Sequence, residues 1–202
     1  IRIGQFGVVF IMMVLLLLFI TFLRKDVFSD NKKIMLVLIN IVILVGMTSF
    51  IVQIDSLYVY LIPVCIFPII TRVFFDTRFA TFIHNITIVI LALMLPNSFE
   101  FIVVQMVTGV VVIVSMLNLQ RRSQFILAAV LVVVSYSVTY TFFQLMNGVR
   151  LQEINPSVYF HFMINGAFTL VAYPLIFLFE RLFGYVTEVS LMELSDTNTK
   201  VL

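Results

Sequence analysis

The sequence predicts an all-α, polytopic membrane protein, a seven-transmembrane helix bundle with its N-terminus outside the cell and its C-terminus inside. Of its 202 residues, 62% are hydrophobic and 11% are charged, and the mean hydropathy is +1.19. A soluble domain is about half apolar and about a quarter charged. The apolar residues fall in runs long enough to cross a hydrocarbon core of about 30 Å. The Lys and Arg residues alternate between connections, which predicts the orientation.

Seven apolar runs are expected to be helices, because helices and closed barrels alone satisfy their backbone polar groups within lipid. The runs do not alternate in polarity as barrel strands do. The predicted spans are 6–23, 34–52, 57–75, 79–95, 101–117, 125–146 and 158–179, which form a transmembrane domain over residues 1–182. The chain starts with Ile1 and shows no cleavage motif after its first run, so we expect a piece of a longer protein rather than a signal peptide.

Proline interrupts two of the predicted spans. Pro63 and Pro68 lie in the third span, and Pro174 lies in the seventh. Each proline removes one helical hydrogen bond and can kink the helix. Membrane helices tolerate such kinks, so a structural kink is favoured over a functional hinge.

The basic residues set the predicted orientation. Ten of them lie at the connections assigned to the inside, and two lie at the connections assigned to the outside. The first group is Arg24, Lys25, Lys32, Lys33, Arg72, Arg78, Arg121, Arg122, Arg181 and Lys200, and the second is Arg2 and Arg150. Cytoplasmic connections carry the excess of Lys and Arg. The split recurs at every inner connection and places the C-terminus inside.

The sequence changes character after the seventh span. Phe183-Gly184-Tyr185 interrupts the apolar run, and a short amphipathic stretch follows it. Ser190 and Glu193 have the spacing of a helix capping box. We therefore expect residues 183–202 to be a cytoplasmic connector that leads out of the membrane.

This connector resembles the junction of a known family. Residues 183–184 and 187–198 are similar to the corresponding segment of the bacterial seven-transmembrane HD hydrolases, the PgpH-type cyclic-di-AMP phosphodiesterases. Three other segments resemble the same family: the third span with Pro63 and the following residues 75–80, the outer turn 95–100, and the inner loop 118–123. The resemblance runs from about residue 5 to the end of the chain and covers the transmembrane region.

The resemblance implies a bacterial inner-membrane protein with an extracellular domain before residue 1 and a cytoplasmic HD domain after residue 202. In the family, the HD domain binds divalent metal and hydrolyses cyclic-di-AMP. This chain has no His-Asp dipeptide, because Asn85 follows His84 and Phe162 follows His161. No catalytic residue can be carried over, and we expect no enzyme activity and no cofactor in this segment.

The two histidines are the obvious candidates for a metal or haem site. His84 lies near the inner end of the fourth span and His161 near the outer end of the seventh. At about 1.5 Å per residue, these positions differ in depth by roughly 15 Å. The single cysteine, Cys65, adds no ligand set. We predict no metal here, and the net charge of +2 gives no reason to expect nucleic acid.

Polar side chains at four-residue spacing mark one face of two spans. The seventh span carries His161, Asn165, Thr169 and Tyr173, and the sixth carries Tyr136, Tyr140 and Gln144. Buried polar groups in membranes usually face the bundle interior. The outer-half residues His161, Asn165, Gln144, Tyr140 and Gln105 are candidates for a ligand pocket. The alternative is interhelical hydrogen bonding, worth about 0.6 to 2 kcal/mol per bond, and it is favoured.

Charged residues near the inner side suggest smaller sites. Arg72 and Asp76 have the spacing of a helix-face ion pair. Glu180, Gly184 and Glu193 are candidates for relaying a signal from the seventh span. For Glu180, a plain ion pair with Arg181 is the favoured alternative.

Three functions remain open for this segment. The leading prediction is a sensory module that relays an outer signal to the cytoplasmic hydrolase. A transporter or channel subunit is a second possibility, although no acidic residue lies mid-membrane. A passive anchor is the third. The bilayer is the expected partner, and a homo-oligomer is compatible with the sequence.

Overall fold

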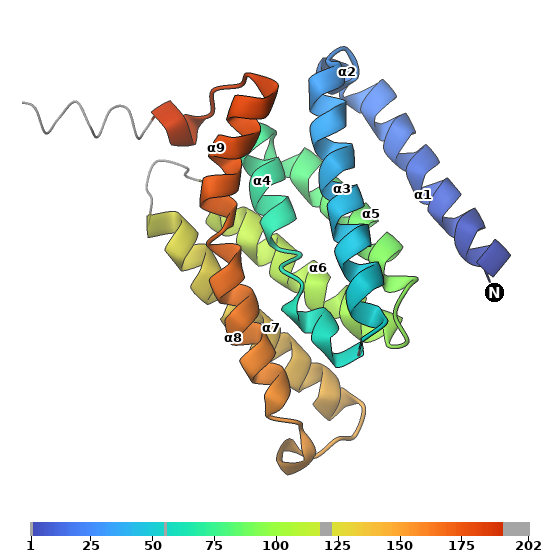
Figure 1. Ribbon diagram of the computed structural model, residues 1–202. Coiled ribbons are helices and arrows are strands. Elements are labelled where there is room, and N and C mark those ends of the chain that lie inside the picture. Colours follow the sequence, from blue (N-terminus) through green and yellow to red (C-terminus); the bar gives the residue numbers. More distant parts are fainter. Residues whose placement is uncertain (1, 55, 118–122, 192–202) are drawn as a thin grey trace, which may run out of the picture.

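The structure is a computed structural model that describes residues 2–54, 56–117 and 123–191 (Figure 1). Every regular element in these ranges is helical, so the predicted all-α class is confirmed. In chain order the elements are α1 (Arg2–Leu23), α2 (Lys25–Phe28), α3 (Asn31–Val52), the 3-10 turn η1 (Ser56–Leu61), α4 (Ile66–Phe74), α5 (Thr77–Ala92), α6 (Ser98–Ser115), α7 (Ser123–Met146), the 3-10 turn η2 (Leu151–Glu153), α8 (Ser157–Thr169) and α9 (Ala172–Phe183).

Five helical segments are long and apolar enough to cross a membrane. They are Ile3–Leu23, Asn31–Val52, Ser98–Ser115, Ser123–Met146 and Ser157–Phe183. Two shorter apolar segments, Tyr58–Phe74 and Thr77–Ala92, occupy the places of the predicted third and fourth spans. All seven predicted spans therefore correspond to helical segments, and two of these segments are shorter than the rest.

The third span is broken rather than kinked, which corrects the predicted continuous helix 57–75. The backbone runs through η1, leaves helical geometry at residues 62–65, and resumes as α4. Pro63 lies in the break, where its missing N–H removes no helical bond. Pro68 is the third residue of α4 and falls in the first turn, whose N–H groups have no helical acceptor.

The seventh span is also divided. It consists of α8 and α9, with a turn at Leu170 and Val171 between them, whereas a single helix over 158–179 was predicted. Pro174 is the third residue of α9. Proline has no N–H to bond the carbonyl four residues earlier, and it is tolerated in the first turn of a helix. A new helix therefore begins just before it.

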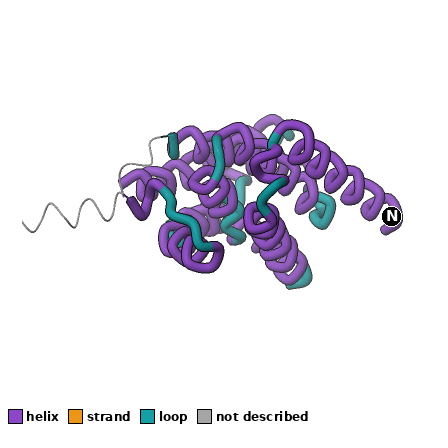
Figure 2. Tube along the Cα trace, turned by 90° about the horizontal axis from the view of Figure 1, so that it is seen from above, coloured by secondary structure: helices purple, strands orange, loops and turns teal. Residues whose placement is uncertain are grey.

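The helices pack unequally around α5. Phe79, Ile83 and His84 of α5 are fully buried within the bundle. By contrast, α1 leans away from the other helices (Figures 1 and 2), and only 11% of its most apolar stretch is buried. In its C-terminal half the ring of Phe19 stacks on Phe82 at 3.8 Å, and near its N-terminus Gln5 Nε2 donates to the Leu93 carbonyl at 2.8 Å. The remaining apolar surface of α1 suits contact with lipid.

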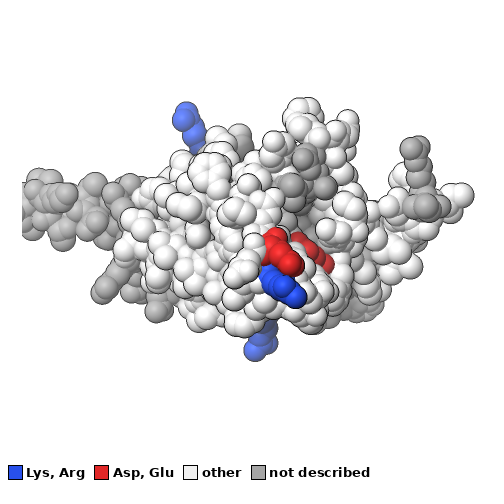
Figure 3. Space-filling model, turned by 90° about the horizontal axis from the view of Figure 1, so that it is seen from below, with Lys and Arg blue, Asp and Glu red and all other residues white. Residues whose placement is uncertain are grey.

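The connections gather at two ends of the bundle. We call the end formed by residues 24–33, 72–78 and 183–191 the basic end. The opposite end, which carries residues 94–100 and 144–157, is the distal end. Figure 3 views the distal end, where nearly all visible side chains are uncharged.

Candidate functional site

Two polar sites are distinguishable, one at each end of the bundle. At the distal end, Glu100 on α6 accepts hydrogen bonds from two other spans. Gln144 Nε2 on α7 donates to Glu100 Oε2 at 3.1 Å, and the Tyr60 hydroxyl donates to Glu100 Oε1. Tyr140 packs edge-on against Tyr60, with ring centroids 5.8 Å apart. The predicted candidate Gln144 thus binds a carboxylate that joins three spans, and the candidate Tyr140 packs against the Tyr60 ring beside it.

Gln105 lies deeper in the same bundle. Its Oε1 accepts a hydrogen bond from the Tyr136 hydroxyl at 2.7 Å, and Cys65 Sγ lies 3.5 Å from that hydroxyl. The three side chains are fully buried and come from α6, α7 and the break before α4. We call Tyr60, Glu100, Gln144, Gln105 and Tyr136 the distal polar cluster.

Asn165 stabilises the broken third span. Its Nδ2 donates to the carbonyl oxygens of Tyr60 and Ile62 at 2.9 and 2.7 Å. An unwound backbone in lipid needs such partners, because an unpaired carbonyl there is costly. The predicted pocket residue therefore holds α8 against the break.

His161 lies apart from these groups. Its ring meets Tyr58 edge-on at 5.6 Å. Five cavities stand out among the described residues, and none of His161, Asn165, Gln144, Tyr140 and Gln105 lines them. All five side chains take part in packing or hydrogen bonding between spans, and the ligand pocket stays a prediction.

Glu100 and Tyr60 are members of the cluster that the sequence reasoning missed. Glu100 is the acidic residue in the first turn of α6, and its carboxylate faces α7. Tyr60 lies in η1, where the third span departs from α-helical geometry, and its ring faces Tyr140. A search for acceptors opposite the sixth-span polar stripe could have found Glu100.

His84 has a packing role between α5 and α6. Its Nε2 donates to the Gln105 carbonyl oxygen at 3.1 Å, and a Cβ added at Gly109 would lie 1.9 Å from that nitrogen. The imidazole therefore fills the space that Gly109 leaves open. Over the described residues, no group of three or more His, Cys, Asp or Glu side chains is placed to hold a metal ion.

At the basic end, Arg24 joins the first connection to the third. Its guanidinium pairs with Asp26 at 2.9 Å and with Asp76, and it lies over the Phe79 ring at 5.0 Å. The hydrogen bond from Arg24 lowers the pKa of Asp26. Arg72 instead donates to the Phe75 and Leu117 carbonyls. The predicted Arg72–Asp76 pair is therefore wrong, because Asp76 lies at the N-cap of α5 and pairs with Arg24 of the first connection.

Glu180 is buried and does not serve as an ion-pair partner of Arg181. Its side chain is 7% exposed, Oε1 accepts from the Thr187 backbone N–H at 2.6 Å, and Oε2 accepts from the Ser190 hydroxyl. These bonds hold the single helical turn formed by residues 188–191 against α9. The helix begins after Thr187, so Ser190 lies inside it rather than at its cap. Glu193, the other half of the expected capping box, lies outside the described residues.

Gly184 ends α9 and turns the chain back toward the bundle. Its φ of 71° lies in the left-handed region, where glycine is favoured. The N–H groups of Gly184 and Tyr185 both donate to the Glu180 carbonyl, at 2.8 and 3.1 Å. This is a glycine C-cap, and it directs Tyr185 toward the first connection.

The connector is fastened to that first connection by two bonds. Lys32 Nζ donates to the Phe183 carbonyl at 3.0 Å, and the Tyr185 hydroxyl donates to Asp30 Oδ2 at 2.5 Å. Asp30 Oδ1 also accepts from the Lys32 N–H at 2.9 Å and so caps α3. We call Asp30, Lys32, Glu180, Gly184, Tyr185, Thr187 and Ser190 the junction.

The junction is partly open to water. A cavity of about 210 Å³ lies beside it, lined by residues that include Lys33, Phe74, Tyr185 and Glu188. The bond from Tyr185 lowers the pKa of Asp30. Burial and the same bond raise the pKa of Tyr185 to about 12. Both shifts favour the hydrogen-bonded pair at neutral pH.

The sequence profile of a family described as "7TM receptor with intracellular HD hydrolase" matches residues 1–187. The chain belongs to this family. The match covers all seven spans and ends inside the junction, so the predicted family and the seven-transmembrane class are confirmed for the membrane region. The chain is thus a multi-pass receptor module of a type linked to an intracellular HD hydrolase. No curated protein and no solved structure matches the chain.

Proposed function

We propose that this chain is the sensory membrane module of a bacterial HD-domain cyclic-di-AMP phosphodiesterase. It would lie in the cytoplasmic membrane with its N-terminus outside, and it would relay a signal from the outer side through the seventh helix to the hydrolase. The family match and the resemblance of residues 183–198 support this proposal. The hydrolase domain that binds the divalent metal would lie outside this chain. An extracellular domain would also lie outside it.

The hydrogen bonds of the junction are the observation that supports the proposed relay. In the proposed orientation, α9 is the last membrane segment before the cytoplasm, and the chain leaves it through Gly184. Glu180 folds the next helical turn back onto α9, while Lys32 and Asp30 hold the turn against α3. A shift of α9 relative to α3 must therefore stretch or break these bonds.

The seventh span can transmit such a shift because it is made of two helices. α8 is bound to the third span by Asn165, and α9 contacts α4 and the junction. A signal that moves the distal polar cluster would reach α8 directly, since Tyr60 belongs to both contacts. A relay of this kind needs two packings of α9 whose balance the signal changes.

The test uses the full-length protein in membranes and measures cyclic-di-AMP hydrolysis. Lys32→Met removes the bond to Phe183, and Tyr185→Phe removes the bond to Asp30. We expect each variant to change the rate by about fivefold or more, the size of a typical coupling between sites. Lys25→Met is the matched control, because Lys25 is exposed at the same end and the same charge is removed.

The outcomes separate the parts of the proposal. If K32M and Y185F hydrolyse at the wild-type rate, the relay fails and a passive anchor explains the module. If the wild-type protein does not hydrolyse cyclic-di-AMP, the substrate assignment fails. A rate change in K25M as large as in K32M would point to surface charge instead of the junction.

A further inference from the structure

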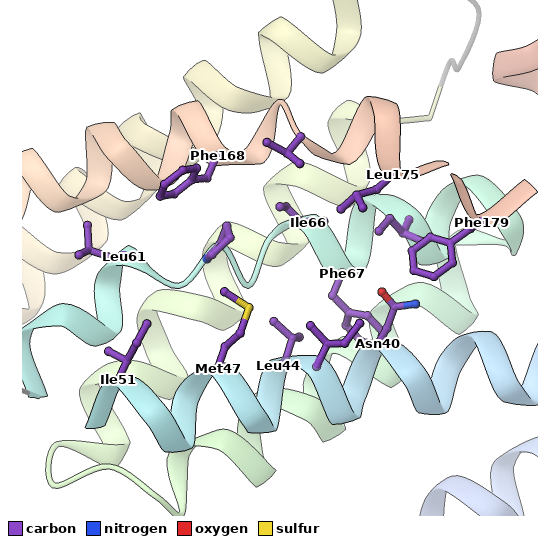
Figure 4. A pocket seen from close by; sticks show the side chains of 14 residues that line it. Asn40, Leu44, Met47, Ile51, Leu61, Ile66, Phe67, Phe168, Leu175 and Phe179 are labelled. Carbon is purple, nitrogen blue, oxygen red and sulfur yellow. The ribbon is translucent and has the colours of Figure 1, made fainter. Parts of the chain in front are cut away.

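The breaks in the third and seventh spans leave an apolar pocket between them. The pocket has a volume of about 500 Å³ and lies between α3, α4, α8 and α9. Figure 4 shows Met47 and Ile51 of α3 on one wall and Phe168 and Leu175 of the seventh span on the opposite wall. Pro63 lies in the break of the third span, and its ring lines the pocket.

The mouth of the pocket opens sideways, between membrane spans. Residues at its edge are exposed although they are apolar: Ile43 is 49% exposed, Phe168 49% and Val171 43%. The lining comes from Asn31–Val52 and Ser157–Phe183, which are long and apolar enough to cross a membrane, and from the shorter apolar segment Tyr58–Phe74. In a bilayer, this opening therefore faces the hydrocarbon chains of lipids rather than water.

The lining excludes polar ligands. Asn40 is the one residue of the lining with a polar side chain, and its Nδ2 already donates to the Leu36 carbonyl at 2.7 Å. A charged or multiply hydrogen-bonding molecule would leave its groups without partners, at a cost of several kcal/mol. A hydrocarbon chain has no such groups.

The length of the pocket matches one leaflet. Its lining on α3 runs from Asn40 to Ile51, which is about 16 Å along a helix axis. The hydrocarbon of one leaflet is about 15 Å thick, half of a core of about 30 Å. The volume also falls within the roughly 300–1,000 Å³ of small-molecule pockets. Ile51 lies at the distal end of α3. A lipid acyl chain would therefore enter the pocket from the distal leaflet and end near Asn40.

We infer that this pocket binds one acyl chain of a membrane lipid from the distal leaflet. The bound acyl chain supplies the apolar contacts that the two broken spans cannot make with α3. It thereby fills the space between α3 and the seventh span and fixes their separation. This site does not depend on the identity of the attached enzyme.

Photolabelling of the full-length protein in lipid nanodiscs tests the inference. The probe is phosphatidylglycerol with a diazirine at the middle of one acyl chain, and labelled peptides are identified by mass spectrometry. We expect several-fold more label on residues 43–51 and 168–175 than on residues 126–138 of α7, which expose Val130 and Val134 to lipid without lining this pocket. Native mass spectrometry should also retain about one lipid per chain.

Filling the pocket should remove the site. Met47→Trp and Val171→Trp add bulk from opposite walls, and Val134→Trp is the matched control on an open lipid face, where Val134 is 50% exposed. We expect the first two to lose the excess label and the retained lipid, while V134W keeps both. Equal labelling of the pocket and α7 in the wild type would overturn the inference, whether or not the variants fold. Unchanged labelling in folded M47W and V171W, or a cross-link to a second copy at this face, would overturn it as well.

Discussion

At the residue scale, a single methyl group added at Gly109 should lower the stability of the protein. A methyl group there would lie 1.9 Å from His84 Nε2, so the imidazole would have to leave its place beside the Gln105 carbonyl. Overpacking of this kind typically costs about 1–3 kcal/mol, and loss of the buried hydrogen bond adds to it. We expect Gly109→Ala to lower the free energy of unfolding in mixed micelles by about 2 kcal/mol or more.

Gly46 provides the matched control for this prediction. It also lies inside a membrane helix, α3, but a Cβ added there meets no atom within 4 Å. Gly→Ala in a helix with free space is stabilising by roughly 0.5–1 kcal/mol. Gly46→Ala should therefore be neutral or stabilising. Similar losses in G46A and G109A would show that the contact with His84 is not the cause.

The Asp30–Tyr185 bond should depend on pH only at the extremes. The pKa of Asp30 is lowered, so its contribution is complete above the unfolded value of about 3.9 and is lost as the pH falls through the lower folded value. The pKa of Tyr185 is raised to about 12, so its contribution is complete below about 10 and is lost as the pH rises through about 12.

We therefore expect the amide-exchange protection of residues 185–191, corrected for intrinsic rates, to be constant from about pH 5 to about pH 9. Protection should fall below about pH 4 in the wild type. Asp30→Asn removes the titrating group but keeps an acceptor, so its acid-dependent loss should be smaller. A steep change in wild-type protection near pH 7 would contradict this assignment.

At the scale of elements, Asn165 is expected to determine the stability of the broken third span. Asn165→Leu removes both donors to the Tyr60 and Ile62 carbonyls, and a buried carbonyl without a partner costs about 1–3 kcal/mol. Asn40 is a buried asparagine that bonds a carbonyl of its own helix, Leu36. We expect N165L to lose about 1–3 kcal/mol of unfolding free energy in mixed micelles and N40L to lose less than about 0.5. Equal losses would show that the break does not need Asn165.

The elements also show how far the sequence could predict this structure. Run length and charge determine the helical class, and the family resemblance rests on local motifs that the sequence contains. The two breaks were expected only as kinks, because a proline lowers helix stability but does not reveal which distant side chain will satisfy the opened backbone. Asn165 lies 103 residues from Ile62, and Lys32 lies 151 residues from Phe183. Contacts at such separations depend on the packing of whole helices, which periodicity within one segment cannot supply.

At the scale of the whole molecule, the orientation is the prediction that affects every other assignment. Ten basic residues against two predict that the basic end lies inside the cell. Ser29 at the basic end and Asn147 at the distal end are both exposed, and Cys65 is fully buried, so it should not react with a membrane-impermeant maleimide. In intact cells, we expect the maleimide to label the Asn147→Cys variant. The Ser29→Cys variant should be labelled only after the membrane is permeabilised. The reverse pattern would place the junction outside, where it could not reach an intracellular hydrolase.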